Sequence, residues 1–589
     1  MKDTTKTGRA ILAVALIIGL LGDLLLRSTP WGLNVTIFNI AFVAGLVWLL
    51  RRYAPEQLTR QTYSLLGALI FFATMFSWRA SHELLVADGF AIVGILGLLF
   101  LPRLGITARV AGVFQYGVAF FWAALNAAFA PAALLSVDIE WKATSTGGWS
   151  RHAIAAARGV AIAAPIVLIF GGLFMAADAA YSGWVQQVFN FPTFDFSHVV
   201  LFSVFSWLSA GYLRGILISA APLAAAAAVV SPVPTAGPAE SKVDRVTRES
   251  GEHPMTLGDR NVVEHINISD PPDAKAETRA AESVPFEAPT PDEKPKTTWQ
   301  WAQIDNAVLP TVFTLGAVEI GVILGLINLL FLSFVIVQVP YLFGGMALVQ
   351  NTPDFKLAEY ARRGFGELVA VAGLVLPILL VSHWLIKGGN SFTHKLFRIL
   401  AGVQIGLLFV IMASAVQRLV LLTGNLGYGL TTVRLYPLIF MVWLAIVFVW
   451  FGATVLRGAR QHFAWGALWS AFLILGSTHV LNPDALIVKT NIALMREGRD
   501  FDAYYNSELS DDALPTLWDA LPEMNDLDQT RITLGLARRY CEKRVETDFR
   551  GWNLSRDVAT NTLGENPAFV EAVGGCDSKL IQYRHYGGD

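Results

Sequence analysis

The sequence is short of charge and of cysteine, and both shortages narrow the class of protein. Asp, Glu, Lys and Arg make up only 15% of the 589 residues, whereas a soluble domain carries about 25%. The net charge of −2 gives no support for nucleic-acid binding. The two cysteines, Cys541 and Cys576, both lie in the C-terminal tail. This number excludes a disulfide-rich scaffold and leaves room for one disulfide between them or for none.

The sequence also lacks the short motifs of common enzyme classes. It contains no P-loop, no GxSxG elbow and no glycine-rich dinucleotide fingerprint. His82 and Glu83 begin like a zinc-binding helix, but the stretch HELLV lacks the second histidine. We therefore assign no catalytic residue, no metal site and no cofactor, and we favour a protein that is not an enzyme.

What the sequence has instead is a series of long apolar runs. Hydrophobic residues make up 54% of the chain, and about 20 apolar residues in a helix cross a bilayer core of about 30 Å. Such segments must be helical because an open strand cannot satisfy its backbone in lipid. The predicted fold is an all-α polytopic transmembrane helix bundle of about 12 spans, in a range of about 11–13. The expected spans are residues 10–26, 31–50, 64–80, 84–101, 109–135, 154–177, 198–222, 308–338, 366–387, 396–420, 433–456 and 463–481.

Composition divides the chain into four parts. Residues 1–230 form an N-terminal membrane region of about seven spans, and residues 306–481 form a second one of about five. Between them, residues 231–305 are rich in proline, alanine and charge, so we expect a disordered linker. Residues 482–589 are polar, with Ile532, Leu536 and Tyr540 at helical spacing, and predict a small helical soluble domain.

The distribution of lysine and arginine predicts how the chain is oriented. Loop 178–197 has neither residue and should lie outside, whereas the linker and the turn at 457–462 should lie inside. This places the C-terminal domain outside the cytoplasm, although Arg362 and Arg363 would then also face outward. The basic N-terminus belongs inside, which requires an odd number of crossings. We therefore expect the count of about twelve to be wrong by one, among the first five spans.

Two charged residues within apolar spans are expected to meet. Arg214 lies about 12 Å from the inner end of its span and Glu319 about 16 Å from the inner end of the next one. A lone charge at the bilayer centre costs between about 3 and more than about 10 kcal/mol. We therefore predict an intramembrane ion pair between Arg214 and Glu319. The alternative is that Arg214 snorkels to the inner interface while Glu319 faces a water pocket alone.

Three stretches of the second half carry a resemblance to a known family. They are EYARRGF at 359–365, YGLTTVRLY at 428–436 and NPDALIVKTN at 482–491, and YYNSELSDDALPTL follows in the tail. Together they resemble an uncharacterised bacterial multi-pass membrane protein family known as a domain of unknown function. The resemblance extends from about residue 155 to the C-terminus, apart from the linker. It implies a bacterial inner membrane protein and brings no established activity.

If these stretches come together, their polar residues form a cluster at the outer membrane face. Such a cluster could bind a lipid head group, a glycan or a protein partner. The alternative is that it only docks the tail onto the bundle, with Asp484 as a helix-start charge. The residues of this predicted outer-face cluster are Glu359, Arg362, Arg434, Tyr436, His479, Asn482 and Asp484.

Three functions are compatible with the sequence, of which we favour the first and keep the other two as alternatives. Many spans with buried charge are typical of transport-like handling of a lipid, glycan or small solute. An external tail and a cytoplasmic recruiting linker favour an envelope scaffold or sensory protein. A membrane-embedded transferase is the third, and it would need a convergent acid or metal cluster near His479 and Asp484. In every case the lipid bilayer is a partner and nucleic acid is not.

Overall fold

The computed structural model describes residues 2–139, 196–218, 315–343, 365–386, 391–425, 429–545, 548–567 and 569. All of them belong to one compact unit. In these ranges the chain is helical, and the single β-bridge joins Leu315 and Ile386. The expected linker at 231–305 and the expected span at 154–177 lie outside the described residues.

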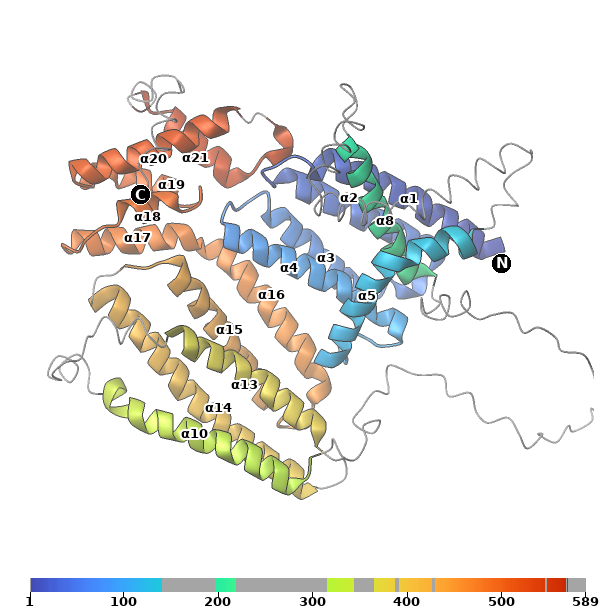
Figure 1. Ribbon diagram of the computed structural model, residues 1–589, viewed down its shortest axis with the longest axis horizontal. Coiled ribbons are helices and arrows are strands. Elements are labelled where there is room, and N and C mark those ends of the chain that lie inside the picture. The colour runs from blue at the N-terminus through green and yellow to red at the C-terminus, as the bar shows by residue number, and fades with distance from the viewer. Residues whose placement is uncertain are drawn as a thin grey trace, which may run out of the picture. The chain divides into compact units, whose positions relative to one another are not determined.

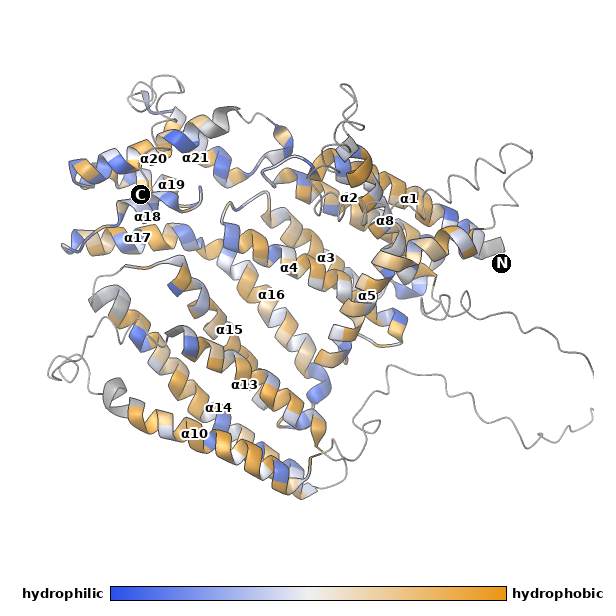
Figure 2. Ribbon diagram, viewed as in Figure 1, coloured by the Kyte–Doolittle hydropathy of each residue, from blue (hydrophilic) through white to orange (hydrophobic). Residues whose placement is uncertain are grey.

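The apolar runs fold into long helices, as Figures 1 and 2 show. Within the described ranges, ten helices are long and apolar enough to cross a membrane, which confirms an all-α polytopic bundle. The helix α3, with 16 residues, is shorter than these ten. The bundle helices are α1 (Lys2–Leu26), α2 (Leu33–Tyr53), α3 (Arg60–Met75), α4 (His82–Leu98), α5 (Val113–Ala133), α8 (Phe196–Leu217), α10 (Ala317–Phe343), α13 (Phe365–Leu385), α14 (Ser391–Val420), α15 (Thr432–Thr454) and α16 (Phe463–Leu481).

Two apolar cores hold these helices together, and α16 takes part in both. The first core is made by α1 to α5 and α8, and the second by α10 and α13 to α15. Leu468 and Phe472 of α16 pack against the first core, whereas Phe463 at its start belongs to the second. Burial of apolar side chains therefore continues from one helix group to the other through α16.

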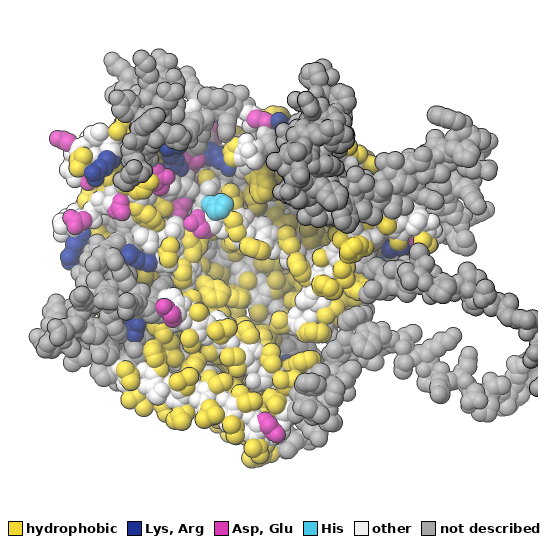
Figure 3. Space-filling model, in the orientation of Figure 1, with side chains coloured by type: hydrophobic (Ala, Val, Ile, Leu, Met, Phe, Trp, Pro, Cys, Tyr) yellow, Lys and Arg dark blue, Asp and Glu magenta, His cyan; other side chains and the backbone are white. Residues whose placement is uncertain are grey.

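The polar tail folds into a separate helical layer with its own core. It contains α17 (Pro483–Arg496), α18 (Ala503–Glu508), α19 (Leu514–Asp519), α20 (Asp526–Val545) and α21 (Leu554–Gly564). Ile532, Leu536 and Tyr540 are buried in its core, as their helical spacing predicts. Charged side chains gather over this domain, whereas apolar ones cover the bundle helices in the same view (Figure 3).

The bundle has two distinct ends, defined by what they contact. The C-terminal domain packs on the end where α1 and α3 finish and where α2 and α4 begin; for example, the Leu33 N–H donates to the Trp552 carbonyl at 2.9 Å. We call this the domain end. His198 near the start of α8 bonds Asp23 near the finish of α1 at 2.7 Å, so α8 also begins there. The opposite end, where α1 starts, is the N-terminal end.

Candidate functional site

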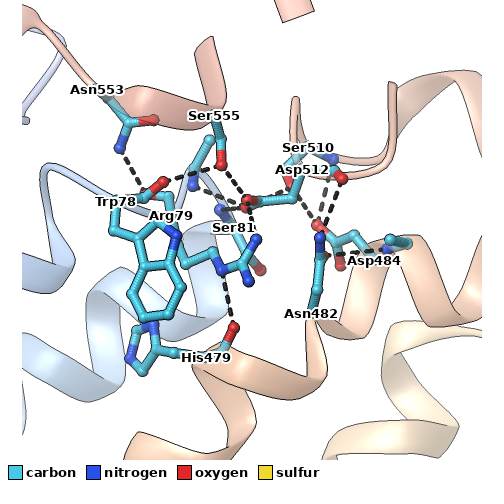
Figure 4. A network of polar contacts seen from close by, with 12 residues as sticks. Trp78, Arg79, Ser81, His479, Asn482, Asp484, Ser510, Asp512, Asn553 and Ser555 are labelled. Carbon is cyan, nitrogen blue, oxygen red and sulfur yellow. Dashed lines mark hydrogen bonds and ion pairs between the residues drawn. The ribbon is translucent and has the colours of Figure 1, made fainter. Parts of the chain in front are cut away.

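The most densely connected polar group at the domain end is the Asp512 carboxylate (Figure 4). Its side chain is only 1% exposed. It lies before α19 and accepts hydrogen bonds from three separate parts of the chain. A buried carboxylate is tolerated when donors surround it in this way. Its donors are the Ala80 N–H at 2.7 Å, the Ser81 N–H at 2.9 Å, the Arg79 guanidinium at 3.3 Å, the Ser510 hydroxyl at 3.2 Å and the Ser555 hydroxyl.

The start of α21 adds a second set of contacts to the same α3–α4 connection. The Asn553 amide donates to the carbonyls of Phe76 at 2.7 Å and Arg79 at 2.8 Å. Its Oδ1 also accepts from the Arg556 N–H at 3.2 Å, which caps α21. The same side chain therefore begins a helix of the domain and holds that helix to the bundle.

The NPD stretch turns the chain from the bundle into the domain. Asn482 has a left-handed φ of 52° and caps α17 by accepting from the Ala485 N–H at 3.3 Å. Its amide donates to the Asp512 carbonyl at 3.2 Å. Asp484 accepts from the Ser510 N–H at 3.3 Å and from the Ser510 hydroxyl. These bonds fix the first turn of α17 against the loop that carries Asp512.

Asp484 is a buried acid that lies near Ser510 and two other carboxylates, those of Asp512 and Glu83. Burial raises the pKa of its carboxyl above the ordinary value; the hydrogen bond from Ser510 opposes this rise, and the nearby carboxylates of Asp512 and Glu83 add to it. Its Oδ1 has no hydrogen-bond partner among the described residues. The ionised form is therefore disfavoured in the docked domain.

The YGLT stretch is clamped by the last residue of the NPD stretch. Asn491 accepts from the Leu430 N–H at 2.7 Å and donates to the Leu430 carbonyl at 3.1 Å. Gly429 has a φ of 70°, and a Cβ there would lie 2.7 Å from the Asn491 Oδ1, so glycine is required. At the start of α15, the hydroxyls of Tyr436 and Ser81 are 2.9 Å apart. The YGLT and NPD stretches, which are separated in sequence, are thus hydrogen-bonded to each other.

A buried histidine and a buried aspartate connect α16 with α4. The His479 Nε2 lies 3.0 Å from the Asp88 Oδ1, and both side chains are fully buried. The imidazole stacks on the Trp78 ring at 6.5 Å, and the Arg79 Nε donates to the His479 carbonyl at 2.8 Å. His479 Nδ1 and Asp88 Oδ2 find no partner among the described residues. The pair joins residues 391 positions apart.

The structure brings together part of the predicted outer-face cluster. Tyr436, Asn482 and Asp484 lie in the network around Asp512, and His479 lies beside it. Arg434 points back to the Gly429 carbonyl. Glu359 and Arg362 lie outside the described residues. The polar groups mostly bond one another, which favours the docking interpretation of the cluster.

Sequence reasoning missed the residues at the centre of this network. Arg79 falls at the end of the expected span 64–80 and Ser81 just after it, with no distinguishing pattern, and Ser555 lies 43 residues beyond Asp512. Asp512 itself belongs to the tail stretch YYNSELSDDALPTL, which was part of the family resemblance. That stretch was the only sequence signal that could have pointed to it.

The expected pair of Arg214 and Glu319 is not formed. Arg214 is 2% exposed and donates to the Asp138 Oδ2 at 2.5 Å, while the exposed Glu319 accepts from the Gly316 N–H at 2.9 Å. The reason is packing: α8 lies against α1 and α5, whereas α10 lies against α14. The expected spans 109–135 and 154–177 leave Asp138 between them, but in the structure Asp138 ends the helical segment that continues α5. The guanidinium therefore neither snorkels nor meets its expected partner.

The remaining site predictions concern the cysteines and metal binding. Cys541 is buried in the domain core and is not a free thiol. Cys576 lies outside the described residues, so the bridge between them stays a prediction. Among the residues that the structure describes, no group of three or more His, Cys, Asp or Glu side chains is placed to hold a metal ion.

The comparisons with known proteins identify a family without adding a function. No curated protein and no solved structure matches the chain. Residues 66–240 and 279–520 match the family described as Domain of unknown function (DUF4153), a range that includes Arg79, Asp484 and Asp512 but ends before α21. Since the match covers more than half of its length, the chain belongs to this family of proteins of unknown function.

Proposed function

We propose that this multi-pass membrane protein is an envelope scaffold that holds its C-terminal helical domain rigidly outside the cytoplasm. The observation that carries the proposal is the Asp512 network. One buried carboxylate bonds the α3–α4 connection, the loop before α19 and the start of α21. A domain that only needed to stay near the membrane would not require so many directional contacts.

The charges at the two ends of the bundle support this orientation. Arginines outnumber carboxylates at the N-terminal end, where α2 and α4 finish and Glu56 lies between α2 and α3, whereas Arg27 and Arg79 at the domain end are accompanied by carboxylates. Cytoplasmic loops carry the excess of lysine and arginine, so the N-terminal end is assigned to the cytoplasm. The arginines at the N-terminal end include Arg51, Arg52, Arg103 and Arg109, and the carboxylates at the domain end include Asp23, Glu83, Asp484 and Asp512.

The polar residues within the spans also suit a scaffold. Asp88 pairs with His479, Arg214 pairs with Asp138, and the Asn328 amide donates to the Leu400 carbonyl at 2.9 Å. These contacts join helices to one another. A solute pathway would instead need such polar groups to face a passage through the bundle. Transport-like handling of a lipid, glycan or small solute is the alternative function, and the experiments below distinguish it from a scaffold.

The rigid attachment can be measured by the distance between two spin labels. One label replaces Arg60 at the N-terminal end and the other replaces Leu534 of α20; both side chains are exposed. In proteoliposomes we expect a single narrow distance distribution, which Asp512→Ala broadens. A broad distribution in the unaltered chain would contradict the proposal.

The cellular role is tested by complementation of a strain that lacks the protein, under a panel of envelope stresses. A scaffold requires the docked domain, so a chain that stops after residue 481 and the Asp512→Ala variant should both fail. A carrier whose work is done by the spans should still function with Asp512→Ala. Deletion of residues 235–298 separates the roles further, because it should disable a recruiting linker and spare a carrier.

A further inference from the structure

Unlike α1 to α4, the helix α5 has both of its ends at the same end of the bundle. At its start, the Phe114 ring stacks on Trp384, the second-to-last residue of α13, at 6.0 Å. One turn and a half later, Phe120 lies against Gly97, at the finish of α4. The finish of α4 belongs to the N-terminal end, because α4 begins at the domain end.

The second half of α5 stays at this end. Asn126 and Pro131 pack on Gly211 and Gly215, in the last turns of α8. The small glycines allow the two helix backbones to approach closely. Beyond them, the helical segment Leu134–Asp138 continues α5. The chain therefore remains near the finish of α8.

The last residue of this segment reaches the start of α1. The Asp138 carboxylate receives the Arg214 guanidinium, and its carbonyl accepts from the Thr5 hydroxyl at 3.3 Å. Gly8 of α1 lies beside Leu134 and Ile139. A helix that crossed the bundle would instead bring this segment to the domain end, at least about 25 Å away along a 17-residue helix such as α4.

The surface of α5 is apolar along its whole length. Residues 113–137 contain no charged side chain, and the aromatic rings of Phe121 and Phe129 are 61% and 67% exposed. Arg109 stands exposed just before the helix. Such a helix is suited to acyl chains, with a cation placed to meet anionic head groups.

We propose that α5 lies along the membrane as an in-plane helix embedded in the leaflet at the N-terminal end, with its phenylalanine face against the lipid acyl chains. The occupant of this face is the bilayer itself, because the neighbouring α1, α4 and α8 are apolar enough to span it. This removes one crossing from the first five expected spans. Ile139 then lies at the N-terminal end and His198 at the domain end, which leaves room for the span expected at 154–177.

The depth of three spin labels tests the proposal directly. Single labels replace Phe114, Phe121 and Phe129 in proteoliposomes that contain phosphatidylglycerol, and depth is measured by relaxation from oxygen against a polar nickel reagent. An in-plane helix gives three similar depths. A crossing helix would change the depth by about 22 Å over these 15 residues, and that result would overturn the proposal.

The sides of the flanking residues provide an independent test in cells. Thr107→Cys and Ser145→Cys are placed singly in a chain with Cys541→Ser and Cys576→Ser, and Thr530→Cys in α20 is the control for the domain end. A membrane-impermeant maleimide should label positions 107 and 145 from the same side and position 530 from the other. Labelling of 107 and 145 from opposite sides would overturn the proposal. If 107 and 145 label from outside and 530 from inside, α5 is still in plane, and only the orientation in the proposed function fails.

Discussion

The two ends of the bundle are held together by different kinds of contact. At the domain end, directional hydrogen bonds converge on buried carboxylates from segments far apart, such as Arg79 and Asp512 at 433 positions. At the N-terminal end, the backbones of α5 and α8 approach closely where they cross, at Gly211 and Gly215 of α8. Beyond this crossing, Arg214 of α8 forms an ion pair with Asp138. One end therefore depends on the chemistry of its side chains and the other mainly on their size.

The largest effect should follow from removing the carboxylate at the domain end. Asp512→Ala leaves the guanidinium of Arg79 and four other donors without their acceptor in a buried place, so we expect a loss of about 4 kcal/mol of unfolding free energy. Thermal unfolding in detergent, with proteolysis of the C-terminal domain as a second readout, measures this loss. Asp519→Ala, an exposed acid in the same domain, is the matched control and should change stability by less than about 0.5 kcal/mol.

The next largest effect should come from the ion pair at the N-terminal end. Arg214→Gln leaves the Asp138 carboxylate, whose side chain is only 9% exposed, without its cation and should cost about 3 kcal/mol. Asp138→Asn in the same chain should restore part of the stability, as a double-mutant cycle would record. Glu319→Gln should have almost no effect, because that side chain is exposed. An equal loss for Glu319→Gln would favour the partner expected from the sequence.

A smaller loss is expected from added bulk at the helix crossing. A Cβ on Gly211 would meet the Asn126 carbonyl and lie 2.6 Å from the Ala127 carbonyl, so Gly211→Ala should cost about 2 kcal/mol. Gly117→Ala on α5 is the control, because nothing lies within 4 Å of its Cβ. If both alanine variants melt at the same temperature, size does not decide the stability of this end.

The smallest effect concerns the dependence of docking on pH. Burial raises the pKa of Asp484 in the folded state, so folding favours its protonated form. Its contribution should therefore decline as the pH rises from the unfolded value of about 3.9 through the raised folded value. Asp484→Asn should flatten this decline and stabilise the docked domain at neutral pH, by less than about 1 kcal/mol. Unfolding curves at pH 5 and pH 8 for both chains measure the difference.

Much of the helical fold could be predicted because it depends on local properties. The length of an apolar run determines whether a helix can span lipid, and the described helices follow the expected runs. The cap at Asn482 before Pro483 and the buried stripe of Ile532 and Leu536 are equally local. Each of these features is visible within a stretch of about 20 residues of sequence or fewer.

The pairing of helices could not be predicted in the same way. Depth in the bilayer placed Arg214 and Glu319 at similar levels, but depth does not tell which helices are neighbours. Composition likewise cannot distinguish α5 from a crossing helix, since both are apolar on all faces. Asp512 is one acid among several in its stretch, and only the folded chain shows that it meets the connection containing Arg79.

The left-handed turn at Asn482 determines the angle of the C-terminal domain about the axis of α16. Since α16 ends at Leu481 and α17 begins at Pro483, the domain has almost no slack with which to adjust its angle about the α16 axis. One residue inserted into α16 would turn everything beyond it by about 100° and would carry Asp512 away from its donors. The number of residues in α16 is therefore constrained as strictly as the identity of the side chains in the Asp512 network.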